Sequence, residues 1–270
     1  RDRDNYIKRQ IKRLTHMAHL QSKSVGPIPG LQQLAAKLYH ASHYCPNSSS
    51  LIHGDFKIDN LIYHPTQPTV IGVLDWELST IGDPLSDLAN LAMMYYIPNN
   101  YTNTIHNNNQ KPSTLTESKS KSTPPPALPL SGLANIPSFQ GTGIPDKHQL
   151  FQTYTYLLLQ PLRNHTNIHT HTLTPNDIHS WRGFYLSFLF FKNAVIVHGV
   201  KHRVSLGVAS SHMANEVAAL LPTMIQIATQ IYIQEPPPTL TTIQSSSSTI
   251  TTTTTHHQPT SISPTMTSKL

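Results

Sequence analysis

The 270-residue chain has little cysteine, little charge and no long apolar run. Its single cysteine, Cys45, excludes an intramolecular disulfide framework and a zinc site built from cysteines. Only 12% of the residues are charged, and the mean hydropathy is -0.29, which together argue against a charged coil and against a membrane protein. The most apolar window, residues 184–200, contains Lys192, Asn193 and His198. It therefore predicts a buried helix and no membrane span.

The net charge of +6 is concentrated at the start of the chain. Residues 1–23 hold seven lysine and arginine residues against two aspartates. Ile7, Ile11 and Leu14 recur at helical spacing, which predicts an amphipathic helix with a basic outer face. A solvated face on an enzyme explains this helix most simply, and we predict no nucleic-acid partner. A nucleic-acid-binding module is the alternative, and it would show a steep salt dependence of binding.

Two stretches have a composition that cannot form a packed core. Residues 99–131 are rich in Asn, Thr, Ser and Pro, and residues 235–270 run through Ser and Thr repeats. Both are predicted to be disordered, since neither buries enough apolar area to offset the entropy of ordering. The folded part is therefore expected to be residues 1–98 and 132–233. Because the chain starts at Arg1 inside a predicted helix, we expect it to be a fragment or an incomplete gene model.

The periodicity predicts an α+β fold that is mostly helical. Three short segments favour strands, and the last two are joined by a turn of the hairpin type: residues 51–53, 61–63 and 70–74. Apolar stripes at helical spacing predict helices in five further places: residues 31–38, 85–92, 150–158, 184–200 and 213–228. Pro222 predicts a kink in the last of these helices.

Polar residues gather around the predicted hairpin in a pattern suited to phosphoryl transfer. The string HGDFKIDN (residues 53–60) comes just before the hairpin, and Asp75 comes just after it. Such a reaction needs a carboxylate for the attacking hydroxyl, oxygen ligands for Mg²⁺ and a cation near the transferred group. We predict Asp55 as the base, Lys57 as the partner of the γ-phosphate, and Asn60 and Asp75 as Mg²⁺ ligands.

The same strings resemble a known family. His-Gly-Asp-x-x-x-x-Asn, Leu-Asp-Trp-Glu and Gly-Asp-Pro-x-x-Asp-Leu-Ala are similar to the motifs of the aminoglycoside phosphotransferase family of kinase-like enzymes, and most resemble the branch found with acyl-CoA dehydrogenases. The resemblance implies transfer of the γ-phosphate of ATP, with Mg²⁺, to a hydroxyl of a small molecule. For this branch the implied acceptor is a hydroxyacyl-CoA.

The resemblance extends to the C-terminal lobe of the kinase-like fold. The 52 residues before His53 hold no glycine-rich loop and no strand with the nucleotide-binding lysine, so the N-terminal lobe is expected to be missing. A non-catalytic remnant of such a kinase is therefore the alternative function. The sequence upstream of Arg1 would distinguish the active kinase from the remnant. The sequence of this chain leaves open whether an acyl-CoA dehydrogenase is a partner.

Other polar residues are expected to support this site. His53, Asp59 and Asp87 are predicted to stabilise the catalytic loop by hydrogen bonds. Lys201 and Arg203 could bind an anionic acceptor such as the phosphate of CoA, or they could form a solvated helix end.

The chain ends in Ser268, Lys269 and Leu270. Ser-Lys-Leu at a free carboxyl terminus is the peroxisomal import address, which a soluble receptor reads. We therefore expect the import receptor as a partner and a peroxisomal location, with the cytoplasm as the alternative.

Overall fold

In the computed structural model the chain is described over residues 5–46, 48–98, 132–134, 136, 138–159, 173–208 and 218–238. The low-complexity segment 99–131, most of the predicted tail and the terminal tripeptide lie outside these residues. Within the described part the elements are α1 (Tyr6–Val25), α2 (Leu31–Ala41), β1 (Ser50–Ile52), η1 (Ile58–Asn60), β2 (Leu61–Tyr63), β3 (Val70–Val73), η2 (Trp76–Leu78), β4 (Thr80–Gly82), α3 (Leu85–Ala92), η3 (Met93–Tyr96), α5 (Lys147–Leu159), α6 (Pro175–Ser205) and α8 (Leu221–Gln234).

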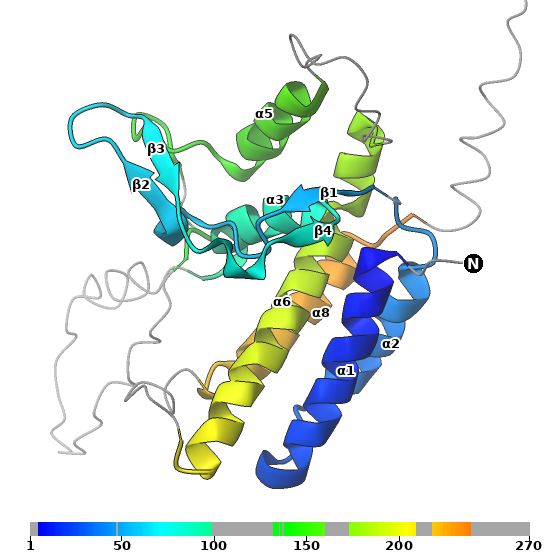
Figure 1. Ribbon diagram of the computed structural model, residues 1–270. Coiled ribbons are helices and arrows are strands. Elements are labelled where there is room, and N and C mark those ends of the chain that lie inside the picture. The colour runs from blue at the N-terminus through cyan, green and yellow to red at the C-terminus, as the bar shows by residue number, and fades with distance from the viewer. Residues whose placement is uncertain are drawn as a thin grey trace, which may run out of the picture. The chain divides into compact units, whose positions relative to one another are not determined.

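Helix α6 is the centre of the helical core because it is apolar on most of its sides. It packs against α1, α2, α3 and α8, and Figure 1 shows α1, α2 and α8 alongside it. A capping box fixes its start, since Thr174 and Asp177 each accept a hydrogen bond from the other's backbone N–H (3.2 and 2.8 Å). The helix is long and apolar enough to cross a membrane, yet 72% of its most apolar window is buried inside the protein. Residues 184–200 thus form the buried helix that the sequence predicts.

Helices α1 and α2 bury the apolar stripes that the sequence places on them. Ile7, Ile11 and Leu14 of α1 are at most 2% exposed. The start of α1 is capped by Asn5, whose side-chain oxygen accepts from the Lys8 N–H at 2.8 Å. The basic residues between the buried positions consequently fall on the outer side of α1.

Residues 213–217 of the helix predicted over 213–228 lie outside the described part of the chain, residue 218 is helical and residues 219–220 form a turn, so the kink at Pro222 stays a prediction. Helix α8 begins at Leu221, and Pro222 lies in its first turn. A proline is accommodated there because the first N–H groups of a helix have no partner within the helix. A proline inside an apolar stripe therefore marks a helix start here, which the stripe alone did not reveal.

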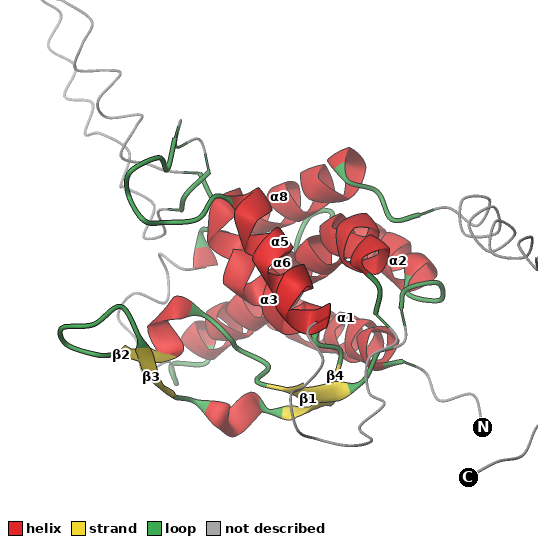
Figure 2. Ribbon diagram, turned by 90° about the horizontal axis from the view of Figure 1, so that it is seen from above, coloured by secondary structure: helices red, strands yellow, loops and turns green. Residues whose placement is uncertain are grey.

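Four short strands form two separate antiparallel pairs in the described part of the chain. Strands β2 and β3 make the predicted hairpin, with Leu61 opposite Val73. Strand β1 pairs with β4. The sequence did not predict β4, because this strand is only three residues long. Figure 2 shows both pairs on one side of the helices. Ile52 of β1 lies opposite Thr80 of β4. The β1–β4 pair therefore holds together the two ends of the segment 53–79, which carries the polar motif.

The folded unit extends past the predicted boundary at residue 233. The compact part of the chain ends at Pro237, and the Arg182 guanidinium forms an ion pair with Glu235 at 2.8 Å. A Cβ atom added to Gly183 would lie 2.1 Å from the Glu235 carbonyl oxygen. The chain after α8 therefore packs directly on the α6 backbone, so Glu235 belongs to the fold and not to a tail.

Candidate active site

The His-Gly-Asp loop is held by two charged side chains from distant helices. The Asp87 carboxylate, on α3, accepts hydrogen bonds from the backbone N–H groups of His53 (2.6 Å) and Gly54 (2.9 Å). The ammonium group of Lys192, on α6, donates to the Gly54 carbonyl at 2.7 Å. These bonds occupy the polar backbone groups of a buried turn and fix its conformation.

Glycine is required in this turn for two reasons. Gly54 has a φ of 85°, in the left-handed region that residues with a Cβ atom rarely adopt. An added Cβ would also lie 2.5 Å from the Leu78 carbonyl oxygen. The loop therefore passes so close to η2 that only glycine fits between them.

His53 connects the loop to the end of β3. Its imidazole is 3% exposed, and its Nε2 donates to the Leu74 carbonyl at 2.8 Å while its Nδ1 accepts from the Asp55 N–H at 3.3 Å. The ring also packs against Trp76, with 4.7 Å between ring centres. His53 thereby fixes the positions of Asp55 and of the residue before Asp75 relative to each other.

Asp55 lies where cationic and amide donors converge. Its Oδ2 is 2.9 Å from the Lys57 ammonium, and its Oδ1 accepts from the Asn90 amide at 3.1 Å. Partial burial disfavours the charged carboxylate, but the hydrogen bonds from Lys57 and Asn90 outweigh it and lower the pKa of Asp55. Asp55 is therefore an ionised carboxylate at neutral pH, half-buried and ready to accept a proton.

Asn60 and Asp75 come together through the backbone of the hairpin. The Asn60 amide nitrogen donates to the Asp55 carbonyl at 2.9 Å, and the Leu74 N–H donates to the Asn60 carbonyl at 2.8 Å. Asp75 follows directly and is exposed, with a φ of 68° that places it in the left-handed region. Aspartate is one of the few residues besides glycine that adopt this region readily, so Asp75 can end the turn after β3 in this conformation.

The donor set at Asn60 and Asp75 fits Mg²⁺. Because the Asn60 nitrogen is bonded to the loop, its side-chain oxygen is available on the opposite side of the amide. Mg²⁺ is commonly held by one or two protein oxygens together with waters and substrate phosphates. In the described ranges no group of three or more His, Cys, Asp or Glu residues is placed to hold a metal, so a closed protein cage of that kind is not formed there.

Three residues singled out from the sequence lie away from these contacts. Asp59 is exposed in η1. Lys201 and Arg203 are exposed in the last turns of α6, and the Lys201 ammonium donates to the Val25 carbonyl at 3.3 Å. At 1.5 Å per residue they lie about 14–17 Å along the helix from Lys192. The structure therefore does not bring Lys201 and Arg203 to the catalytic loop.

Two residues of the site were not predicted from the sequence. Asn90 reaches Asp55 from α3, and Lys192 reaches Gly54 from α6. The only signal for Lys192 is a lysine within an otherwise apolar helix, where burial lowers its pKa although Asp55 and Asp87 favour its charged form. Asn90 gives no comparable signal, since an amide within an amphipathic helix is common.

A buried carboxyl group lies beside the site, at the start of α3. Asp83 is 3% exposed, accepts from the Leu85 N–H at 3.0 Å and accepts from the Tyr185 hydroxyl at 2.5 Å. Burial raises the pKa of Asp83 to about 7, since these two bonds only partly compensate for the loss of solvent. Asp83 thus couples the end of β4 to Tyr185 in the first half of α6.

A helical lobe that carries a His-Gly-Asp loop and a β hairpin defines the class of kinase-like phosphotransferases. A family model described as "Phosphotransferase enzyme family" matches residues 1–105. A crystal structure from Ralstonia eutropha JMP134, of a protein assigned as an aminoglycoside phosphotransferase, covers 85% of this chain with 26% identity and a TM-score of 0.60. Residues 1–105 thus match the phosphotransferase enzyme family.

Curated relatives narrow the similarity to one branch. Mouse acyl-CoA dehydrogenase family member 11 is 32% identical over 228 residues, which are 83% of this chain and 23% of the relative. Mouse acyl-CoA dehydrogenase family member 10 is 29% identical over 232 residues, or 86% of this chain and 17% of the relative. The chain therefore spans less than a quarter of the length of these two relatives, and 56% of the Ralstonia chain.

Proposed function

We propose that this chain carries the acceptor-activating and metal-binding half of a site that transfers the γ-phosphate of ATP to a hydroxyl group. The observation that supports it most is the convergence on Asp55. An ionised carboxylate is bonded to Lys57 and Asn90, and its backbone carbonyl is bonded to Asn60. A purely structural aspartate in a loop does not require this set of contacts. A proton acceptor that lies beside an Mg²⁺ ligand does require it.

In the proposed reaction the acceptor hydroxyl lies against Asp55. Its oxygen forms a bond to the γ-phosphorus of ATP as the bond to the bridging oxygen breaks, and its proton passes to the Asp55 carboxylate. Lys57, 2.9 Å from Asp55, places a positive charge beside the transferred group. Asn60 and Asp75 would hold Mg²⁺, which when bound neutralises phosphate charge.

We propose a hydroxyacyl-CoA as the acceptor. Two observations support this choice over an aminoglycoside. The curated relatives are named acyl-CoA dehydrogenases, and they match more than four fifths of the chain. The Ralstonia protein, assigned as an aminoglycoside phosphotransferase, shares 26% identity.

The test is phosphoryl transfer from Mg·ATP to a hydroxyacyl-CoA by the full-length protein, with and without Asp55→Asn. Loss of the base should lower kcat/KM by about 10²–10⁴-fold. Asp177→Asn is the matched control, since it makes the same chemical change in the capping box of α6, away from the loop. Full transfer activity in Asp55→Asn would refute the assignment.

The second candidate function is a non-catalytic remnant of such a kinase. It is favoured if the wild-type protein neither binds ATP nor transfers phosphate while remaining folded by circular dichroism. The contacts of Asp55 with Lys57, Asn60 and Asn90 favour the enzyme, because they keep the proposed base beside the proposed metal ligand.

We also propose import into peroxisomes, on the sequence of Ser268, Lys269 and Leu270. These residues lie outside the described part of the chain, so the proposal rests on the tripeptide alone. A fluorescent protein fused before residue 1 should enter peroxisomes, and deletion of Leu270 should leave it in the cytoplasm. An unchanged distribution after the deletion would exclude this signal.

A further inference from the structure

The carboxylate of Asp55 is covered by donors from the protein itself. Its Oδ2 accepts from the Lys57 ammonium at 2.9 Å and from the Asn60 amide at 3.3 Å, and its Oδ1 accepts from the Asn90 amide at 3.1 Å. A carboxylate offers about four lone-pair sites, so these donors take most of them. Only 27% of the Asp55 side chain is exposed. An acceptor hydroxyl therefore has to compete with one of these donors for the base.

Lys57 is the donor that can leave. Asn90 is buried in α3, and the buried Asn60 is held by a second bond from its amide nitrogen to the Asp55 carbonyl at 2.9 Å. The Lys57 side chain is 39% exposed and extends from the loop just before η1. An ion pair that is partly exposed to solvent contributes little to stability, so it breaks at little cost. Rotation of the flexible lysine chain can therefore open Oδ2 while the other two donors stay in place.

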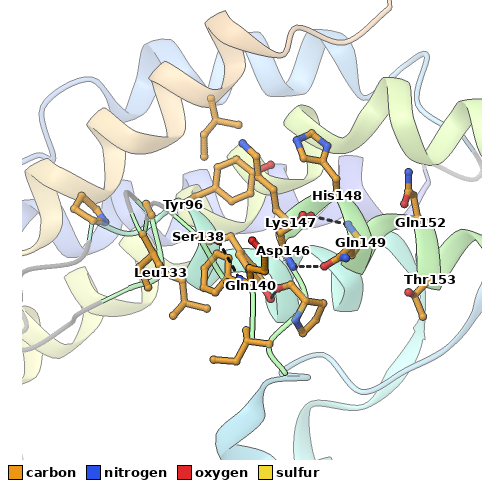
Figure 3. Close-up of a pocket in the computed structure, with 18 of the residues that line it drawn as sticks. Tyr96, Leu133, Ser138, Gln140, Asp146, Lys147, His148, Gln149, Gln152 and Thr153 are labelled. Carbon is orange, nitrogen blue, oxygen red and sulfur yellow. Dashed lines mark hydrogen bonds between the residues drawn. The ribbon is translucent and has the colours of Figure 1, made fainter. Parts of the chain in front are cut away.

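The anion that draws Lys57 away has to come from a bound molecule. In the part of the chain that the structure describes, Lys57 forms an ion pair with Asp55 and with no other carboxylate. The Asp87 carboxylate is bonded to two N–H groups of the loop. Asp146, labelled in Figure 3, and Glu235 line a separate cavity of about 1250 Å³, and its lining includes neither Asp55 nor Lys57.

A nucleotide phosphate is such an anion. Its charge exceeds that of one carboxylate, and a lysine ammonium binds phosphate as a point charge. The proposed metal ligand Asn60 contacts the same oxygen of Asp55 as Lys57 does. Phosphates bound at Asn60 through a metal ion would therefore lie near the Lys57 ammonium. The hydroxyl of an acceptor carries no charge, so by itself it competes poorly with the ammonium for Asp55.

We infer that Lys57 closes Asp55 in the free protein, and that a nucleotide phosphate opens it by drawing the Lys57 ammonium away from Oδ2. The nucleotide therefore binds before the acceptor hydroxyl reaches the base. The inference rests on the proposed function, since it describes how the Asp55 site is regulated. Lys57 is thus a positioning residue as well as the partner of the phosphate.

The same contact limits the basicity of Asp55. Burial raises the pKa of Asp55, and the hydrogen bond from Lys57 is the largest of the effects that lower it, followed by the bond from Asn90. When Lys57 leaves, the pKa of Asp55 rises towards its ordinary value, and the carboxylate accepts a proton more readily. Lys192, the other cation that lowers this pKa, stays bonded to the loop backbone. One movement of one side chain therefore both uncovers the base and strengthens it.

The test measures whether an external nucleophile can reach the Asp55 carboxyl. The full-length protein is treated with a water-soluble carbodiimide and glycinamide, with and without Mg·AMP-PNP, and peptide mass spectrometry quantifies the products. In the free protein Lys57 should attack the activated Asp55 carboxyl, which forms an internal amide while the carbodiimide takes up the elements of water. Mg·AMP-PNP should lower this internal amide and raise the glycinamide label on Asp55 at least fivefold. A nucleotide that merely shielded Asp55 would lower both products.

Lys57→Met should give the high glycinamide label without nucleotide, and Mg·AMP-PNP should change it less than twofold. Lys37→Met is the matched control, because it removes an exposed lysine of α2, and it should behave as the wild type does. Far-ultraviolet circular dichroism establishes that both variants are folded.

Equal labelling of the nucleotide-free wild type and Lys57→Met would show that Lys57 does not cover the base. An equal increase with Mg·AMP-PNP in both proteins would overturn the inference too, because the nucleotide would then open Asp55 by another route. Phosphoryl transfer without a change in labelling refutes the inference and leaves the proposed function standing. A change in labelling without phosphoryl transfer refutes the proposed function and leaves the closure by Lys57 standing. If calorimetry detects no binding of AMP-PNP, the proposed function fails and the opening by nucleotide fails with it.

Discussion

Lys192 places a buried positive charge beside the catalytic loop. Its ammonium donates to the Gly54 carbonyl, and its charge contributes to lowering the pKa of Asp55. We predict that Lys192→Met lowers kcat/KM about 10–100-fold, the equivalent of about 1.5–3 kcal/mol for a charged hydrogen bond. Removal of the charge should also shift the acid limb of the kcat/KM profile to higher pH, because Asp55 becomes easier to protonate.

The control for this variant is Lys37→Met, which removes an exposed lysine of α2. Lys192→Arg should recover part of the rate, since it restores the charge. A loss of thermal stability in Lys192→Met with an unmoved pH profile would show that Lys192 only supports the fold.

Asp83 makes the stability of the fold depend on pH. Its pKa is raised to about 7 by burial, against about 4 in an unfolded chain, so the folded state binds this proton more tightly. The contribution of Asp83 is therefore greatest below pH 4 and is lost as pH rises towards 7. Between these limits the free energy of unfolding should fall by about 1.4 kcal/mol per pH unit on account of this group alone.

Asp83→Asn mimics the protonated carboxyl and should remove this slope. The measurement is urea unfolding of the wild type and Asp83→Asn at pH 5 and pH 7. We expect the variant to gain stability relative to the wild type as the pH rises, since groups common to both proteins cancel in the difference. A difference that is independent of pH would mean that the Asp83 carboxyl titrates near its ordinary value.

At the scale of single residues, the sequence predicted those site residues that lie close together in one short motif. Asp55, Lys57 and Asn60 lie within six positions, so their spacing alone predicts that they meet. Asn90 and Lys192 reach the same loop from helices 35 and 138 positions away, to Asp55 and Gly54 respectively. Such contacts depend on how the helices pack, which the composition and periodicity of each helix do not determine.

At the scale of elements, the end of α8 is fixed by its approach to α6. Gly183 permits this approach, because a Cβ atom would lie 2.1 Å from the Glu235 carbonyl oxygen. We predict that Gly183→Ala destabilises the protein by about 1–3 kcal/mol, although alanine is about 1 kcal/mol better than glycine inside an isolated helix. Thermal unfolding followed by circular dichroism measures the effect.

Gly199→Ala is the matched variant on the same helix. Its Cβ would meet the Gln21 side-chain nitrogen at 2.8 Å, which is the end of a flexible side chain and can move. It should therefore cost clearly less than Gly183→Ala. The reverse order would mean that the segment after α8 is not packed on α6.

The elements themselves were predictable in proportion to their length and periodicity. The apolar stripes gave α1, α2, α3 and α6, and the turn between residues 64 and 68 gave the β2–β3 hairpin. Strand β4 was missed because three residues show no alternation, and it is defined by its pairing with β1. Pro222 lies in the first turn of α8, and an apolar stripe alone does not distinguish a proline that kinks a helix from one that begins it.

At the scale of the whole molecule, α6 joins the active-site loop to the helical core. Tyr185 bonds to Asp83 and Lys192 bonds to Gly54, so the loop cannot detach without breaking contacts of the central helix. We therefore expect the loop and the core to unfold together. The sequence could not indicate this coupling, because the residues concerned are about 100 or more positions apart.

The two tryptophans of the chain report on these two regions separately. Trp181 is 4% exposed in α6, and Trp76 is 47% exposed beside His53. Trp181→Phe leaves a fluorescence probe in the loop, and Trp76→Phe leaves one in the core. In each variant the urea midpoint from fluorescence should coincide with the midpoint from circular dichroism of that same variant, so that any stability lost through the substitution cancels. If the loop probe changed at a clearly lower urea concentration than the helices, the loop would open on its own, and the contacts of Lys192 and Tyr185 would not couple it to the core.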